Sequence, residues 1–335
     1  MARWEARAPI DDLAGERPTR FVTLRDGRAL SYMELGDPHG FPILHHHGMP
    51  GSRLQQEGEP GLYARLGVRV VTPDRPGYGM SDPNQAGGLL DWADDARQLM
   101  DAIGAWRFGV TALSGGGIFA LACAAAMPER VVNVALTGCP APMQIPHAFR
   151  HMRFMTRAGV WLAGHLPGVV EVAGDLASGF VRRHPRWVFE QFNRDVPAPD
   201  RKWLSMPSVA GGAVADVREG LRHGASGYTR DLELLARPWD FDVSSIRVPV
   251  DIWHGAADVV IPPQHGAYLG AAIPGARLHT CPGEGHLVMW SHLPEILLTA
   301  SGRSTSSGPP TAGRKALLPR VWWPETRDIL RVEEN

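Results

Sequence analysis

A single serine stands where an apolar run meets a helix-forming run, and this junction constrains the fold more than any other stretch. Residues 108–113 (FGVTAL) are apolar and include a β-branched valine and threonine, which is typical of a buried strand. From Gly115 the sequence continues GGGIFALACAAAM, which is typical of a helix that ends before Pro128. Ser114 lies between the two runs.

A strand that turns directly into a helix holds the residue at the turn in a strained backbone conformation. Such a turn requires residues with almost no side chain two positions before it and two positions after it. Ala112 and Gly116 meet this requirement, with alanine where glycine is more usual, so Ser114 fits the pattern of a nucleophile elbow. A tight glycine-rich turn, of the kind that also binds phosphate, is the alternative interpretation of this stretch.

Length and charge limit the classes of protein that this chain can belong to. A chain of 335 residues can form one large domain, or a core domain with an insertion. Its content of 44% apolar and 21% charged residues is ordinary for a soluble enzyme. The net charge of −1 gives no electrostatic reason to expect nucleic acid or an anionic membrane as a partner. We expect a small-molecule substrate, and the oligomeric state stays open.

The cysteines and the apolar runs indicate in which cellular compartment the protein works. Cys123, Cys139 and Cys281 are widely scattered and odd in number, without a disulfide framework or a zinc-site spacing, which favours a reducing environment. The N-terminal residues mix acidic and basic side chains and lack the apolar segment of a signal peptide. The apolar run at 118–127 is too short to span a bilayer. We therefore expect a cytoplasmic protein without integral membrane contact.

Short apolar runs alternate with helix-like runs over most of the chain. The expected strands are 21–24, 29–35, 41–46, 68–72, 108–113, 131–136, 248–254 and 277–281. The expected helices beside them are 54–66, 89–103, the run after the elbow, 264–272 and 287–298, and Pro60-Gly61 interrupts the first of them. This alternation predicts an α/β fold with a doubly wound, mostly parallel sheet.

The strand–helix alternation stops between 140 and 238. Apolar residues there recur at helical spacing over 149–166, 169–181 and 187–192, without a strand pattern, which predicts an inserted helical subdomain. After Ala300 the sequence SGRSTSSGPPTAGRK is too polar to pack. The expected organisation is an N-terminal arm at 1–20, a core at 21–139 and 239–300, an all-helical insertion at 140–238, and a low-complexity linker with a C-terminal tail at 301–335.

A serine hydroxyl becomes a good nucleophile only when a base removes its proton and an acid orients that base. Ligands of an open α/β sheet bind at the carboxyl ends of its strands, so the partners should lie in the loops there. Asp258 follows the seventh expected strand and His286 follows the eighth. Ser114, Asp258, His286 is the chain order that follows a nucleophile elbow. The loop at 137–144 contains no carboxylate and cannot supply the acid.

With these partners in place, the chain resembles the α/β-hydrolase superfamily, specifically its serine-nucleophile, esterase-like members with a helical cap. The resemblance covers about 21–300, and five stretches in the family's order carry it: HHHGMPGSR, DRPGYGMSD, ALSGGG, HGAADVVIP and GEGHL. It implies an α/β-hydrolase fold, with an eight-stranded, mostly parallel sheet, helices on both faces, and 140–238 as a cap over the carboxyl edge of the sheet.

The resemblance also implies an oxyanion hole. Attack on an ester carbonyl produces an anionic oxygen that needs fixed hydrogen-bond donors, each worth about 3–4 kcal/mol. The first donor is the backbone N–H of Gly115, directly after the nucleophile. The second, by resemblance, is the backbone N–H of Met49. No cofactor is implied.

Three consecutive histidines at 45–47 suggest a metal site at first sight. Consecutive side chains of a strand point to opposite faces, so all three cannot bind one ion. We expect no metal here and instead expect local hydrogen bonds around the loop. Asp74 and Arg75 precede a segment of turn residues, and we expect them to hold that turn together.

The expected function is hydrolysis of a carboxylic ester, or a related acyl bond, in a small to medium, largely apolar substrate through an acyl-enzyme intermediate. This is a carboxylesterase-type activity. The serine disfavours epoxide hydrolysis and haloalkane dehalogenation, which use an aspartate nucleophile in this superfamily. Carbon–carbon bond hydrolysis, lactone opening and acyl transfer stay open on the same residues. A non-catalytic ligand receptor of the same fold is the alternative from a different class.

Overall fold

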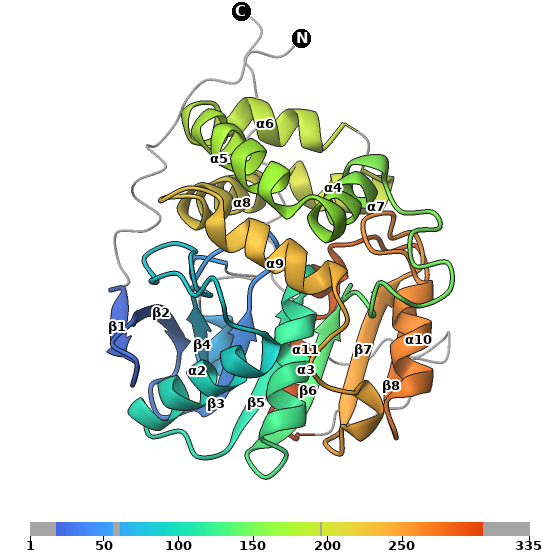
Figure 1. Ribbon diagram of the computed structural model, residues 1–335. Coiled ribbons are helices and arrows are strands. Elements are labelled where there is room, and N and C mark those ends of the chain that lie inside the picture. The colour runs from blue at the N-terminus through green and yellow to red at the C-terminus, as the bar shows by residue number, and fades with distance from the viewer. Residues whose placement is uncertain (1–17, 56–60, 195, 304–335) are drawn as a thin grey trace, which may run out of the picture. The chain divides into compact units, whose positions relative to one another are not determined.

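The computed structural model describes residues 18–55, 61–194 and 196–303. The expectations for the N-terminal arm before residue 18 and for the tail from residue 304 onward lie outside these residues. In the described part, an eight-stranded sheet runs in the order β1-β2-β4-β3-β5-β6-β7-β8, with helices on both of its faces (Figure 1). Among the residues that the structure describes, every helix is too short or too polar to cross a bilayer.

The strands follow the predicted positions closely, with ends that differ by two residues or fewer. They are β1 (Arg20–Thr23), β2 (Ala29–Gly36), β3 (Phe41–His46), β4 (Val68–Pro73), β5 (Phe108–Leu113), β6 (Val131–Thr137), β7 (Val250–Gly255) and β8 (Arg277–Cys281). The first two strands pair antiparallel, as does β2 with β4, and all other pairs are parallel. The predicted fold class is therefore confirmed.

The helices that accompany the sheet include two short 3₁₀ turns. These elements are α1 (Leu62–Arg65), α2 (Leu89–Ala102), η2 (Ser114–Gly116), α3 (Gly117–Ala126), η3 (Val243–Ser245), α10 (Gln264–Ala272) and α11 (Val288–Ala300). Alternate residues of the central strands point to opposite faces and enter two separate apolar clusters. Leu44, Val110 and Leu136 pack with α2, α3 and α10, whereas Ile43 and Ala135 pack with α1 and α11. A sheet covered on both faces explains why these strands are continuously apolar.

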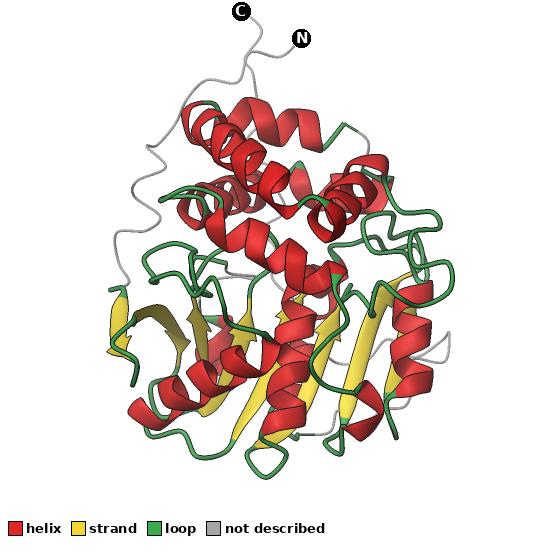
Figure 2. Ribbon diagram, in the orientation of Figure 1, coloured by secondary structure: helices red, strands yellow, loops and turns green. Residues whose placement is uncertain are grey.

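The insertion between β6 and β7 contains helices and, in its described residues, no strand. These helices are α4 (Phe154–His165), α5 (Pro167–Arg183), α6 (Pro185–Phe192), α7 (Ala198–Leu204), α8 (Pro207–Gly220) and α9 (Ser226–Ala236). Figure 2 shows them gathered above the carboxyl ends of the strands. Pro167, Pro185 and Pro207 each occupy the first position of a helix, where the missing N–H is harmless. We call α4–α9 the inserted helices.

Two predicted helices are shorter than the sequence indicates. The helix expected at 54–66 is reduced in the described residues to α1, because Gly61 at its start adopts a left-handed conformation with φ of +84°. The helix expected at 149–166 begins only at Phe154. The preceding residues form a turn in which His147 and His151 have positive φ angles, so a helix cannot pass through them.

Buried carboxylates of the inserted helices bind basic side chains of the core loops. Asp231 of α9 accepts hydrogen bonds from Arg75 at 2.7 Å and from the hydroxyl of Tyr78 at 2.8 Å. Arg53 donates from one nitrogen to both Glu219 of α8 and Asp74, each at 2.7 Å. Arg75 is fully buried, so this ion pair is shielded from water and salt. The inserted helices are therefore attached to the core by charge as well as by apolar contact.

We expect Asp231→Ala to lower the free energy of unfolding by about 3 kcal/mol, because it leaves the guanidinium of Arg75 buried without its partner. Urea denaturation measures this change. Glu233→Ala on the same helix is the matched control. It breaks a pair with Arg230 whose side chains are 21% and 18% exposed, so water screens it in part and the loss should stay below about 1 kcal/mol. Equal losses in the two variants would contradict the role given to the buried pair.

Candidate active site

Ser114 occupies a strained turn at the end of β5. Its φ angle is +53°, a region that residues with a side chain rarely adopt, and such strain costs about 1–3 kcal/mol. The turn passes close beneath the loop that follows β3. A Cβ atom at Gly116 would overlap the carbonyl groups of His46 and His47. Glycine at position 116, two residues after the serine, is therefore a steric requirement of this turn.

The loop that contains Met49 lies against Ser114 and Gly115. A Cβ atom placed on Gly48 would be 3.7 Å from the Cβ of Ser114, and one placed on Gly115 would overlap the side chain of Met49. The N–H of Gly48 donates to Oε1 of Gln55 at 3.0 Å. The N–H of Met49, in contrast, has no acceptor among the described residues. A donor without an acceptor beside the serine is what an oxyanion site requires.

Arg75 supports the loop of Met49 through hydrogen bonds to the backbone of that loop. Its guanidinium donates to the carbonyl of His47 at 2.6 Å and to the carbonyl of Gly48 at 3.1 Å. The same side chain binds Asp231 of the inserted helices, so one arginine links α9 to the loop of Met49. Asp74 accepts from the N–H of Met80, which confirms that it holds the following turn.

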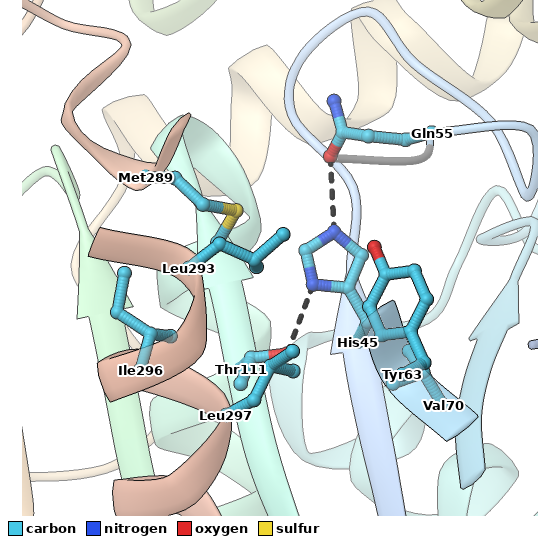
Figure 3. A pocket seen from close by; sticks show the side chains of 9 residues that line it. All are labelled: His45, Gln55, Tyr63, Val70, Thr111, Met289, Leu293, Ile296 and Leu297. Atoms are coloured by element: carbon cyan, nitrogen blue, oxygen red, sulfur yellow. Dashed lines mark hydrogen bonds between the residues drawn. The ribbon is translucent and has the colours of Figure 1, made fainter. Parts of the chain in front are cut away.

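The three consecutive histidines bind three different sets of partners. His45 bonds to Thr111 Oγ1 at 2.9 Å and to Gln55 Oε1 at 3.2 Å, as Figure 3 shows. The ring of His46 accepts from the indole N–H of Trp92, and the ring of His47 bonds to the carbonyl of Gly48. Burial lowers the pKa of His45 to about 4 and the pKa values of the other two well below their usual range. All three are therefore neutral at pH 7.

The cavity drawn in Figure 3 lies beside His45, between the strands β3 and β5 and the helices α1 and α11. Its volume is about 10 Å³, with Tyr63, Leu293 and Ile296 among its apolar walls. That space holds about one water molecule. It is too small for an acyl substrate, so it belongs to the support of the loop through His45 and Gln55.

Asp258 and His286 come together from the loops after β7 and β8. Oδ2 of Asp258 lies 2.8 Å from Nδ1 of His286. Oδ1 of Asp258 accepts from the backbone N–H groups of Val260 and Ile261, at 2.8 and 2.9 Å. Gly138, at the end of β6, leaves space for this pair, because a Cβ there would be 3.1 Å from Nδ1 of His286. The carboxylate is therefore buried, fully bonded and fixed in orientation.

The contact with Asp258 determines which nitrogen of His286 can take a proton. An ionised carboxylate only accepts hydrogen bonds, so Nδ1 carries the hydrogen and Nε2 is the basic atom. Burial lowers the pKa of His286, but the charge of Asp258, its hydrogen bond and the charge of Asp200 outweigh this effect and raise the pKa above its usual value. The pair is therefore a strengthened base.

The structure brings two of the three predicted catalytic residues, Asp258 and His286, into contact. The hydroxyl of Ser114 forms no hydrogen bond with the described residues, and this includes His286. Hydrogen bonds to a nucleophile are often long in enzymes without substrate and shorten on binding. Ser114 instead contacts the loop of Met49, which lies over the turn.

Asp200, in the first turn of α7, is a residue of this site that the sequence analysis did not identify. Its carboxylate accepts from the backbone N–H groups of His286 at 3.0 Å and of Leu287 at 2.9 Å, and it is 2% exposed. A Cβ at Gly285 would overlap this carboxylate. The sequence gives no local signal for the contact, because 86 residues separate the two groups.

Asp216 of α8 was also missed, and it supports the loop of Met49 from the side of the inserted helices. Its Oδ1 accepts from both the backbone N–H and the hydroxyl of Ser52, at 2.7 Å each. Burial raises the pKa of Asp216 to about 7, although the two bonds to Ser52 act in the opposite direction. The inserted helices therefore contact the loop of Met49 through Asp216 and the loop of His286 through Asp200.

Two curated proteins that resemble this chain are named as enzymes. The chain is 27% identical over 293 residues to a non-heme chloroperoxidase of Streptomyces lividans, and this alignment covers 82% of this chain and 95% of that protein. It is 26% identical over 277 residues to a bifunctional esterase/perhydrolase of Acinetobacter calcoaceticus, and this alignment covers 79% of this chain and 92% of that protein.

The fold is shared with solved structures as well. A hydrolase from Pseudomonas aeruginosa PA01 superposes with a TM-score of 0.63 at 20% identity, covering 85% of this chain and 98% of that one. The model of the α/β hydrolase fold family matches residues 42–293, which include the serine turn, the loop of Met49 and the Asp258–His286 pair. Together with the sheet order and the inserted helices, these matches show that the chain belongs to the α/β hydrolase fold family.

Proposed function

We propose that this protein is a serine hydrolase that cleaves the carboxylic ester of a small to medium, largely apolar substrate. The observation that carries the proposal is the strained conformation of Ser114, φ +53°, at the carboxyl edge of the sheet. Strain of this kind persists only where the surrounding structure enforces it, and it occurs mainly at functional sites. The esterase named among the relatives supports the choice of an ester.

In the proposed reaction Nε2 of His286 takes the hydroxyl proton of Ser114 as Oγ attacks the ester carbonyl. The carbonyl oxygen becomes an anion and accepts hydrogen bonds from the N–H groups of Met49 and Gly115. His286 then returns the proton to the leaving alcohol, and an acyl group remains on Ser114. A water molecule, deprotonated by His286, releases the acid and restores the serine. Asp258 stays ionised and stabilises the imidazolium throughout.

The inserted helices have two roles in this proposal. We assign residues 140–238 to a cap that covers the site and selects the substrate by shape. The same helices hold the site's loops, because Asp200 bonds to the backbone of His286 and Asp216 bonds to Ser52. Asp200 is a positioning residue, since it acts on the substrate only through the histidine loop.

We expect Ser114→Ala to lower the turnover of a p-nitrophenyl ester by about 10⁴-fold or more, because the acyl-enzyme can no longer form. Steady-state kinetics on short-chain esters measure the loss, and circular dichroism should show an unchanged fold. Ser291→Ala, which alters an exposed hydroxyl bonded to Glu284, is the matched control and should retain full activity. An Ser114→Ala variant with near-normal turnover would exclude this serine as the nucleophile.

The rate–pH profile should reflect the environment of His286. The base must be neutral, so kcat/KM should rise with pH through one ionisation whose midpoint lies above the usual histidine value of about 6.5. Asp200→Asn removes a negative charge that favours the imidazolium, so its midpoint should move to lower pH and its kcat should fall. Asp242→Asn, an exposed carboxylate at η3, is the control and should leave the profile unchanged.

An Asp200→Asn variant whose midpoint equals that of the wild type, or shifts upward, would rule out the electrostatic part of this role. A variant that loses thermal stability but keeps both the midpoint and kcat would show that Asp200 is structural only.

A further inference from the structure

Helix α5 directs its apolar side toward solvent. Val169, Val172, Leu176 and Phe180 recur at intervals of three and four residues, so they lie on one side of the helix. Their exposed fractions are 55%, 64%, 75% and 46%. The buried residue of this helix is a serine, Ser178. A surface helix normally buries its apolar side, so this arrangement is the reverse of the usual one.

The exposed apolar surface continues onto the neighbouring helices. Nine of the fifteen large apolar side chains that are exposed in the described residues lie between the start of α4 and α6: Phe154, Met155, Trp161, Leu166, Val169, Val172, Leu176, Phe180 and Trp187. Figure 1 shows α5 and α6 on the side of the inserted helices that faces away from the sheet. Apolar side chains concentrated in this way usually mark a binding surface.

Arginines border this apolar surface. An open groove of about 530 Å³ at the end of α5 is lined by Arg182, Arg183, Arg186 and Arg218, together with His184, Pro185 and Trp187. No carboxylate belongs to its lining. Arg183 follows Phe180 by three residues and Leu176 by seven, so it continues the apolar side of the helix. Guanidinium groups bind phosphate oxygens in pairs of hydrogen bonds.

We propose that this surface, formed by the exposed side of α5 and the arginine groove, docks on a bilayer that contains anionic lipids. The exposed Arg183 and Arg218 contact lipid phosphates, while the apolar side chains of α5 and the ring of Trp187 enter the boundary between headgroups and acyl chains. A helix that combines an apolar side with arginines and aromatic residues lies in the plane of such an interface. The contact is peripheral, and no helix among the described residues is long and apolar enough to cross the membrane.

Charge complementarity selects the bilayer over two other occupants. A second copy of this chain would bring its own four arginines against these four, at a cost from like charges. The chain segment 304–335 contains five basic and four acidic residues, so its net charge has the same sign as that of the groove. The overall net charge of −1 does not oppose docking, because screening limits charge interactions to about 8 Å at physiological salt. Local charge therefore decides the partner.

Co-sedimentation of the full-length protein with vesicles tests the proposal. Vesicles of phosphatidylcholine with about one third phosphatidylglycerol should bind the protein, pure phosphatidylcholine should bind it far less, and about 0.5 M salt should weaken the binding. The double variant Arg183→Glu/Arg218→Glu should bind at least about tenfold less tightly. Val172→Asp/Leu176→Asp should lose binding to a similar degree. Free inorganic phosphate at millimolar concentration should not displace the wild type, because the apolar contact remains.

A control variant separates this surface from charge in general. Arg107→Glu/Arg247→Glu reverses two exposed arginines elsewhere on the chain and should bind as the wild type does. Equal loss in this control, equal binding to neutral and anionic vesicles, or no binding at all would overturn the proposal. Displacement by phosphate alone would assign the groove to a soluble anion. A dimer in sedimentation velocity that Leu176→Asp dissociates would assign the surface to a second copy, and each of these results also overturns the membrane proposal.

Discussion

The site depends on how little space there is between the loop of Met49 and the turn at Ser114. The turn at Ser114 fits there only because Gly116 has no side chain to meet the carbonyl groups of His46 and His47. This close contact brings Ser114 and Gly115 against the loop of Met49. A methyl group at position 116 would separate the turn from the loop. The strained φ of Ser114 and the location of the proposed oxyanion donors therefore have the same cause.

The inserted helices support the loops of the candidate site. Buried carboxylates reach from these helices to the core: Asp216 to Ser52, Asp231 to Arg75, and Asp200 to the backbone of His286. A buried polar or charged group is expensive unless it is hydrogen-bonded or paired, so each of these contacts favours the docked arrangement. This coupling means that the position of the proposed base depends on the same helices that we propose select the substrate.

Local patterns explain why the sheet, the serine turn and the placement of Asp258 and His286 could be predicted from the sequence. Strand alternation, small residues around Ser114 and loops at strand ends are all properties of neighbouring residues. Asp200 and Asp216 could not be found in this way, because their partners are distant in the chain. The local sequence does not distinguish these two residues from other acidic residues on helices. The exposure of α5 was equally hidden, since an apolar helical period does not reveal which side faces solvent. Pro60-Gly61 signalled an interruption in the helix expected at 54–66, whereas the left-handed conformation that Gly61 adopts is seen only in the structure.

The central claim is that Ser114 is a nucleophile activated by His286, and covalent labelling tests it most directly. The wild type would be treated with a fluorophosphonate, digested, and its peptides analysed by mass spectrometry. We expect one adduct, on the hydroxyl of Ser114, formed much more slowly in His286→Ala and absent in Ser114→Ala. An adduct on another residue, or labelling of Ser114 at the same rate without His286, would contradict it.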